Sequence, residues 1–543
     1  MSVLAKQPVS RMNSPYPRRW AALGVLCLSL LIVVMANTAL IVAAPSMTRE
    51  LGLSSADLQW VIDGYTVPYA AMMLLFGVIG DKYSRRGALV TGLVVFGAGA
   101  VLGSLADTTQ FVVGARIVMG VGAAIIMPAT LSLLVATFPR SERGRAIAVW
   151  AATSGLAIAF GPLLAGWLLE SGSWNSTFLI NVPIAVAAIV AAFALVPPSK
   201  SERQGPIDWM GGLLSVATIG GLVYAIIDGF HFGIGSSTIV AGLGSIVGGL
   251  LFLAWELEHP RPLLDVRKLG DRTVGGASLA VLLLFLTAFG VIYTIAQEFQ
   301  FVLGYGPLET GTKLLPLAVA VSVGSALSSR IAARAGTRVA IASGMGVAAV
   351  GTLPLLQVDG STGYGTFLVS LILIGAGIGL AVSPATDAIM GSFPEHDLGA
   401  AGGLNDTAIE FGGSLGIALL GSVLATNYKD GIAGFLDSLP LGQLGGAQAE
   451  QAHQALEIAG DSVGGASLVA EELAKNPFAQ SQAEPMLAAA GDAFAGAITQ
   501  AGAVGGAMLA VGAIVVAFVL PGRRSSEVED SGSGRESVEH SLA

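Results

Sequence analysis

Four carboxylates lie inside stretches that are otherwise apolar and helical. Asp63 interrupts the run WVIDGYTVPYAAMMLLFG at residues 60–77, about one turn from its start. Asp406 and Glu410 are four residues apart, so a helix places both on one face. Two carboxyls buried side by side tend to hold a proton between them, because burial and like charge both oppose full ionisation. The pair is therefore a candidate proton carrier, and Asp387 is a third candidate.

One arginine, Arg116, lies inside the apolar run ARIVMGVGAAIIMP at residues 115–128. A charge within a membrane helix is costly and commonly faces a cavity or an opposite charge. Asp63 and Arg116 lie at similar depth in their helices, so we expect them to pair. The alternative for Arg116 is a side chain that extends to the membrane surface. The alternative for Asp406 is a helix cap near the membrane boundary.

The composition indicates an integral membrane protein. Of 543 residues, 53% are hydrophobic and only 12% are charged, against about 25% charged in soluble proteins. Apolar runs of 18 or more residues recur throughout, and each is long enough to cross a bilayer as a helix. The first run is long for a signal peptide and lacks a cleavage site, so we expect a retained helix. The predicted spans are approximately 20–44, 57–79, 88–106, 111–137, 145–168, 176–196, 208–228, 237–256, 273–296, 311–333, 338–356, 364–391, 401–426 and 498–521.

The distribution of positive charge predicts the orientation. Fourteen spans place both termini on one side of the membrane. Most of the 27 Lys and Arg residues then fall on that side, which the positive-inside rule identifies as cytoplasmic. The exceptions are Arg49, Lys313, Lys429 and Lys475, which fall on the opposite side, and Arg116, which lies within a helix.

The predicted domains follow from this topology. The polar tails 1–19 and 525–543 are expected to be cytoplasmic, and the second to be disordered. Between them we expect a six-helix bundle over 20–200, two inserted helices over 201–260, and a second six-helix bundle over 261–524. A faint repeat between DKYSRRGALVTG and ARAGTRVAIASG suggests that the bundles are related. The acidic segment 428–492 is predicted to be an extracellular loop with short helices in its Ala-rich parts.

The segment GVIGDKYSRR, residues 77–86, concentrates charge in a short turn between two helices. Gly77 allows close helix approach, while Asp81 can accept from backbone N–H groups or from Arg85 or Arg86. Such contacts suit a conformational latch that holds one state and opens in another. The alternative is ordinary cytoplasmic charge required by the topology.

The segment GLAIAFGPLLAG, residues 155–166, places a Gly-Pro step inside an apolar helix. Pro162 removes a backbone hydrogen bond and Gly161 relieves the resulting clash, so a bend is expected. Gly155, Gly161 and Gly166 allow tight packing. The alternative is small-residue helix packing without a special role.

Several classes of chemistry have no support in the sequence. There is no G-x-x-x-x-G-K-[ST] segment for ATP. The five histidines lack metal-ligand spacing, and Cys27 is the only cysteine. No nucleophile constellation appears. We therefore expect no enzyme activity, no metal, no cofactor and no nucleic-acid partner.

The chain resembles the major facilitator superfamily, specifically its 14-helix drug:proton antiporters of the quaternary-ammonium-exporter type. GVIGDKYSRR is similar to the superfamily's loop motif, with Ser84 where a Gly is usual. RIVMG and GPLLAG are similar to its helix 4 and helix 5 motifs, with Ala165 replacing a Gly; WVIDGY and FLINVP also match. One departure is Ala36, in VVMANTAL, where relatives commonly have an Asp.

The resemblance implies two six-helix bundles plus two inserted helices that rock to expose a central site alternately. It implies proton or cation handling by Asp63, Asp406 and Glu410, and proton coupling by Arg116. The expected function is proton-coupled efflux of amphipathic, cationic or neutral drugs by a monomer in the cell membrane. Two alternatives stay open: export of one dedicated antibiotic, metabolite or lipid, and a membrane sensor or scaffold that transports nothing.

Overall fold

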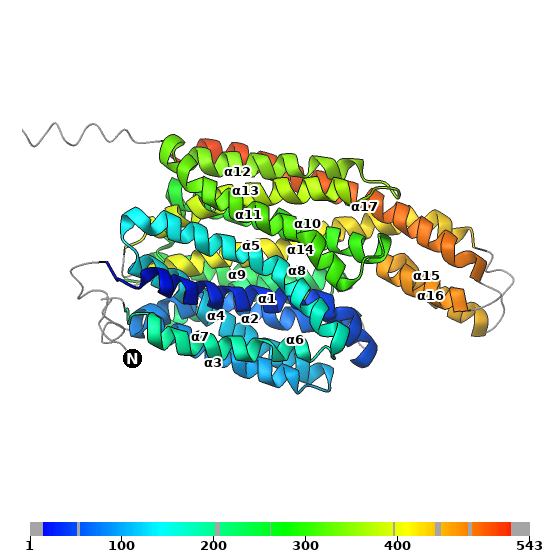
Figure 1. Cartoon of the computed structure of the whole chain (residues 1–543), viewed down its shortest axis with the longest axis horizontal. Coiled ribbons are helices and arrows are strands. Elements are labelled where there is room, and N and C mark those ends of the chain that lie inside the picture. The colour runs from blue at the N-terminus through cyan, green and yellow to red at the C-terminus, as the bar shows by residue number, and fades with distance from the viewer. Residues whose placement is uncertain are drawn as a thin grey trace, which may run out of the picture.

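Every regular element that the structure describes is a helix (Figure 1). The computed structural model describes residues 15–51, 55–200, 207–260, 262–394, 397–439, 447–475 and 480–522. Fourteen helical segments in these ranges are long and apolar enough to cross a bilayer. The predicted all-helical, 14-span architecture is confirmed. The predicted disordered tail 525–543 and residues 1–14 lie outside the described residues.

The N-terminal half comprises α1 to α7. Most of these helices are apolar on several faces, as expected where helices face either lipid or one another. Ser84 caps α3: its backbone is extended and its Oγ accepts from Gly87 N at 2.9 Å. The bounds are α1 Arg19–Leu51, α2 Ser55–Tyr83, α3 Arg85–Ser104, α4 Thr109–Thr137, α5 Arg140–Ser171, α6 Ser176–Leu179 and α7 Asn181–Leu195.

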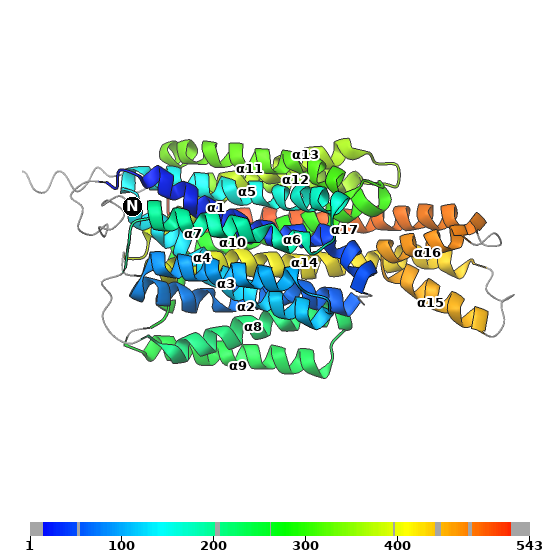
Figure 2. The same cartoon turned by 60° about the horizontal axis from the view of Figure 1, so that its bottom comes forward.

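Two inserted helices, α8 (Trp209–Phe232) and α9 (Ser236–Glu258), lie along one flank of the molecule (Figure 2). Asp208 caps the first turn of α8, where it accepts from Gly211 N at 2.8 Å. The same carboxylate accepts from Trp255 Nε1 of α9 at 3.0 Å, so it ties the two helices together. Helix α8 packs against α2 and α14, whereas α9 packs mainly against α8.

Among the described residues, the C-terminal half comprises α10 to α17 with four short helical turns. A π-helical turn, η4, continues α10 without a break. The bounds are η3 Val266–Gly270, α10 Arg272–Gln297, η4 Glu298–Val302, α11 Pro307–Ala335, α12 Thr337–Gly351, η5 Leu353–Gln357, α13 Tyr364–Gly391, α14 Leu398–Asp437, α15 Ala447–Asp461, α16 Val463–Lys475, η7 Gln480–Gln482 and α17 Ala483–Val519.

The predicted bounds were too short for the last two spans. Helix α14 continues to Asp437 and α17 begins at Ala483, so both enter the segment predicted as a loop. Tyr428 explains the extension: it is buried, stacks edge-on against Phe494, and donates to Ala459 O at 2.9 Å. These contacts stabilise helical turns whose composition is too polar for a hydropathy pattern to identify. The predicted short helices of this segment are α15 and α16.

The sixth predicted span is also different, because it is divided into α6 and α7. Asn181 begins α7, and its Nδ2 donates to Thr177 O at 2.9 Å. An Asn side chain that binds a nearby carbonyl competes with the regular helical hydrogen bonds. The break between α6 and α7 therefore lies at Asn181, whose side chain competes for these backbone carbonyls.

The helix ends define two ends of the molecule. At the basic end, Arg19, Arg85, Arg140 and Arg272 lie at the first residues of α1, α3, α5 and α10. At the hairpin end, α15 and α16 project together with the start of α17 (Figure 1). The halves meet chiefly where α5 packs on α11 and α2 packs on α14.

Candidate functional site

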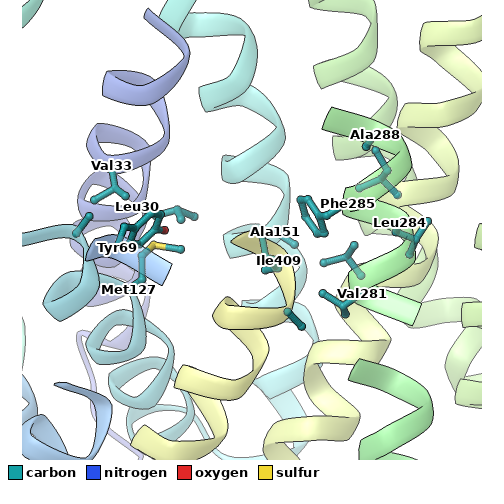
Figure 3. Close-up of a cluster of buried hydrophobic side chains, with 14 of the residues drawn as sticks. Leu30, Val33, Tyr69, Met127, Ala151, Val281, Leu284, Phe285, Ala288 and Ile409 are labelled. Carbon is teal, nitrogen blue, oxygen red and sulfur yellow. The ribbon is translucent and has the colours of Figure 1, made fainter. Parts of the chain in front are cut away.

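A central cavity lies between the two halves. It consists of two adjoining hollows that share Ser154, Phe285, Phe289 and Ile409. Most of the wall is apolar, with Trp150 contributed by α5 and phenylalanines by α10. Figure 3 shows Leu30, Val33, Tyr69 and Met127 on one side, facing the helix that carries Ile409. Such a wall binds an apolar body, while a few polar groups fix its orientation.

Glu410 is the acidic residue of this wall, where it joins Asn37, Thr38 and Tyr69. Helix α14 brings it there from the C-terminal half, whereas the other three come from α1 and α2. A single carboxylate in an apolar cavity interacts strongly with any cation that enters, because little water screens it. Glu410 can therefore bind either a proton or a cationic group.

Asp406 lies one turn from Glu410 and is fully buried. Its Oδ1 accepts from Asn405 Nδ2 at 2.9 Å, and Asn405 Oδ1 in turn accepts from Thr386 Oγ1 of α13 at 2.9 Å. The alternative interpretation of Asp406 as a helix cap is wrong, because α14 begins two turns earlier, at Leu398. The predicted carboxyl pair is thus placed on one face of α14, inside the protein.

Arg116 is also buried, with 1% of its surface exposed. Its guanidinium donates to Val61 O at 3.1 Å, Ala36 O at 3.4 Å and Asn37 Oδ1 at 3.2 Å. It also lies over the Tyr65 ring at 4.3 Å. The alternative of an arginine that extends to the membrane surface is therefore wrong. Ala36 contributes a backbone carbonyl to this set of acceptors.

The other two predicted acids are placed differently. Asp63 belongs to α2, but its side chain lies outside the described residues, so its pairing with Arg116 stays a prediction. Asp387 is exposed, and the cation that acts on it is Arg143 of α5. The structure therefore does not bring Asp387 into the buried carboxyl pair.

The predicted latch connects the two halves at the basic end. Asp81 is 2% exposed and accepts from Arg85 Nε at 2.5 Å and from the backbone N–H of Gly399, the second residue of α14. A Cβ on Gly77 would collide with the carbonyl of Gly399, so the helices meet backbone to backbone. Arg86 instead donates to Val196 O at 3.2 Å, within the N-terminal half.

The glycines of the Gly-Pro segment lie at two helix contacts of α5. Side-chain atoms added at Gly155 and Gly166 would collide with Val321 and Leu308 of α11. At Gly161 they would collide with Thr38 and Met35 of α1. Pro162 lies inside α5, which continues from Arg140 to Ser171. Small residues here let α5 approach both a helix of its own half and one of the other half.

Sequence reasoning missed several residues of the site. Tyr65 and Tyr69 follow Asp63 on α2, and their rings lie 5.4 Å apart beside Arg116 and Glu410. Their spacing of four residues was visible, but it is equally typical of a packed core. Glu298 is another buried carboxyl that no motif indicates: it is 1% exposed at the first residue of η4, and it does not line this cavity.

Fold and site together define a class: a helical membrane transporter with two halves around a central cavity. The chain matches the family model of the Major Facilitator Superfamily over residues 26–417. It belongs to this superfamily, and the predicted family is confirmed.

Its relatives include exporters and resistance proteins. The multidrug efflux pump LfrA of Mycolicibacterium smegmatis is 31% identical over 87% of this chain and 91% of its own. The methyl viologen resistance protein SmvA of Salmonella typhimurium is 31% identical over 93% and 98%. The puromycin resistance protein pur8 of Streptomyces alboniger is 34% identical over 76% and 83%.

A solved structure supports the fold. An inward-facing, unoccupied bacterial homolog of the human lysosomal transporter Spinster matches with a TM-score of 0.57. The match covers 93% of this chain and 98% of that one, at 15% sequence identity. At this identity the likeness concerns the fold alone.

Proposed function

We propose that this protein exports amphipathic, cationic or neutral drugs and toxic compounds across the cell membrane in exchange for protons. The observation that carries this proposal is the apolar, aromatic cavity between the halves, with Glu410 in its wall and Asp406 one turn behind. An amphipathic cation matches such a cavity, since its apolar body meets Phe285 and Phe289 while its charge meets Glu410. A proton competes for the same carboxylate, so binding of one favours release of the other.

The energetics of this exchange are sufficient for export. One proton that moves down about 150 mV releases about 3.5 kcal/mol, from roughly 2.3 kcal/mol per 100 mV. That energy supports a concentration ratio of about 300, since roughly 1.4 kcal/mol corresponds to a factor of ten. Neither ATP nor a bound cofactor is required, and the protein acts as a monomeric transporter, not as an enzyme.

The other predicted residues have supporting roles in this proposal. Asp63 alternates between pairing with Arg116 and contacting a proton or a cationic substrate. Asp81 and Arg85 hold the halves together at the basic end in one stage of the cycle. The relatives named as drug pumps and resistance proteins support drugs as the substrate class.

Purified protein in proteoliposomes tests the proposal. An imposed proton gradient should drive uphill movement of a fluorescent cationic dye, and adding the dye to detergent-solubilised protein should release protons. A sensor or scaffold would give neither signal. A susceptibility panel in an efflux-deficient host separates the multidrug exporter from a dedicated one, which would protect against a single compound.

We further propose that both termini and the basic end are cytoplasmic. In a Cys27→Ser background, a cysteine at Ser462, exposed between α15 and α16, should react with impermeant maleimide in intact cells. A cysteine at Ala335, exposed at the end of α11, should react only after the membrane is permeabilised. The reverse pattern would contradict this orientation.

A further inference from the structure

The carboxyl pair of α14 faces a polar strip on α2, contributed by the other half of the protein. The two helices run antiparallel, with Gly77 against Gly399 and Leu74 against Gly403. Continuing this register by about two turns brings Thr66 and Tyr69 opposite the segment 406–410. The layer therefore contains hydroxyls from one half and carboxyls from the other.

Polar atoms of this layer are buried without hydrogen-bond partners among the described residues. They comprise one carboxylate oxygen and three hydroxyls, although buried polar atoms are ordinarily satisfied. Tyr69 is 1% exposed and Asp406 is fully buried. The Tyr69 hydroxyl and the Glu410 carboxyl lie near enough to act on each other as hydrogen-bond partners, although a hydrogen bond of regular geometry is not formed, and Asp406 acts on the hydroxyl electrostatically. The four atoms are Thr66 Oγ1, Tyr69 OH, Asp406 Oδ2 and Thr407 Oγ1.

We propose that Tyr69 completes the proton site as a positioning residue. When the carboxyl pair has lost its proton, the Tyr69 hydroxyl donates to the carboxylate of Glu410. When the pair holds a proton, this bond is absent. This inference rests on the proposed function, which makes Glu410 a proton carrier.

The chemical reason is that a hydroxyl binds a carboxylate more strongly than a neutral carboxyl. The bond crosses the contact between the two halves, since Tyr69 belongs to α2 and Glu410 to α14. Loss of the proton therefore draws the halves together at this level, and protonation releases them. Tyr69 in this way makes the contact between the halves depend on the proton.

The other described groups around Glu410 are less suited than Tyr69 to donate this hydrogen bond. The acid on its own helix is Asp406. On α2, Thr66 does not line the cavity, and the Tyr65 hydroxyl already donates to Val33 O at 2.9 Å. From α4, Arg116 lies over the Tyr65 ring and binds Asn37 of α1.

From α5 and α10, the cavity residues beside Glu410 are uncharged: Ser154, Phe285 and Phe289. The Asp63 side chain lies outside the described residues. Tyr69 is thus the hydroxyl donor in the wall that comes from the opposite half and has no competing acceptor among the described residues.

Tyr69→Phe tests the inference, because it removes the hydroxyl and keeps the ring that packs against Tyr65. The pH midpoint of proton release on substrate addition should rise by about one unit, a tenfold change that corresponds to one bond to a charged group. Turnover should fall about tenfold, while substrate affinity at low pH stays within twofold. The matched control is Tyr428→Phe, which removes an equally buried hydroxyl that bonds to Ala459 and should leave the midpoint unchanged.

A second variant keeps the test independent of folding defects. Placing 3,5-difluorotyrosine at position 69 makes the hydroxyl a stronger donor, so the midpoint should fall. An unchanged midpoint in both variants would overturn the role of Tyr69. If wild-type protein itself releases no protons on substrate addition, the proposed function fails instead, so the two failures are distinguishable.

Discussion

Glu410→Gln is expected to abolish uphill export while substrate still exchanges downhill. Glutamine preserves the shape of the side chain and its hydrogen bonding but cannot release a proton. The concentration ratio of about 300 that one proton supports should therefore fall to about one. Dye accumulation under a proton gradient, compared with counterflow without one, measures both quantities in the same proteoliposomes.

The matched control for this prediction is Glu309→Gln. Glu309 lies at the start of α11 with its side chain 50% exposed, 3.9 Å from Lys313 and outside the cavity. The Glu309→Gln protein should therefore build up the same dye concentration ratio as the wild type. A well-folded Glu410→Gln protein that accumulates dye like the wild type would show that this carboxyl does not carry the coupling.

The Asp406→Asn variant shows whether Asp406 and Glu410 share one proton or bind one proton each. If Asp406 and Glu410 hold one proton between them, each single variant should lose uphill export and the double variant should add nothing. Independent sites would instead leave each single variant with part of the gradient. The measurement is again the steady-state dye ratio.

Asp81→Asn is expected to slow turnover at least tenfold with substrate affinity nearly unchanged. The substitution removes the carboxylate that accepts from Arg85 Nε, and it weakens the bond to Gly399 N. Removing one partner of a buried ion pair commonly costs about 3–5 kcal/mol, but Arg85 belongs to the same half, so that cost does not depend on the conformation. The bond to Gly399 N joins the halves, so its weakening falls on the conformation in which the basic end is closed.

Glu142→Gln provides the comparison for Asp81. Glu142 binds Arg19 at 2.7 Å at the same end of the molecule, but both residues belong to the N-terminal half. Loss of that ion pair should leave turnover close to wild type. Equal turnover in the Asp81→Asn and wild-type proteins would contradict the latch, whatever its effect on expression.

The sequence by itself determined the class, the number of spans and the positions where chemistry was to be expected. Long apolar runs predict membrane helices because no other element satisfies its backbone inside a bilayer. For the same reason Arg116, Asp406 and Glu410 stood out, since a charge in such a run is costly without a purpose. The motif around Asp81 was visible because several charges fall in one short turn.

Only the tertiary structure decided which of these groups meet. It joined Asp81 to Gly399 over a separation of 318 residues and placed Asp387 on an exposed face instead of beside Asp406. It extended α14 and α17, because contacts such as Tyr428 with Phe494 stabilise turns that hydropathy assigns to a loop.

Tyr69 illustrates the physical reason. Its side chain is typical of a helix core, and its neighbours in sequence do not reveal what it faces. Its proximity to Glu410 depends on the register of α2 against α14, which close contacts such as Gly77 with Gly399 fix. The cost of burying a charge is a local property that a sequence pattern records, whereas the partner of that charge depends on how distant helices pack.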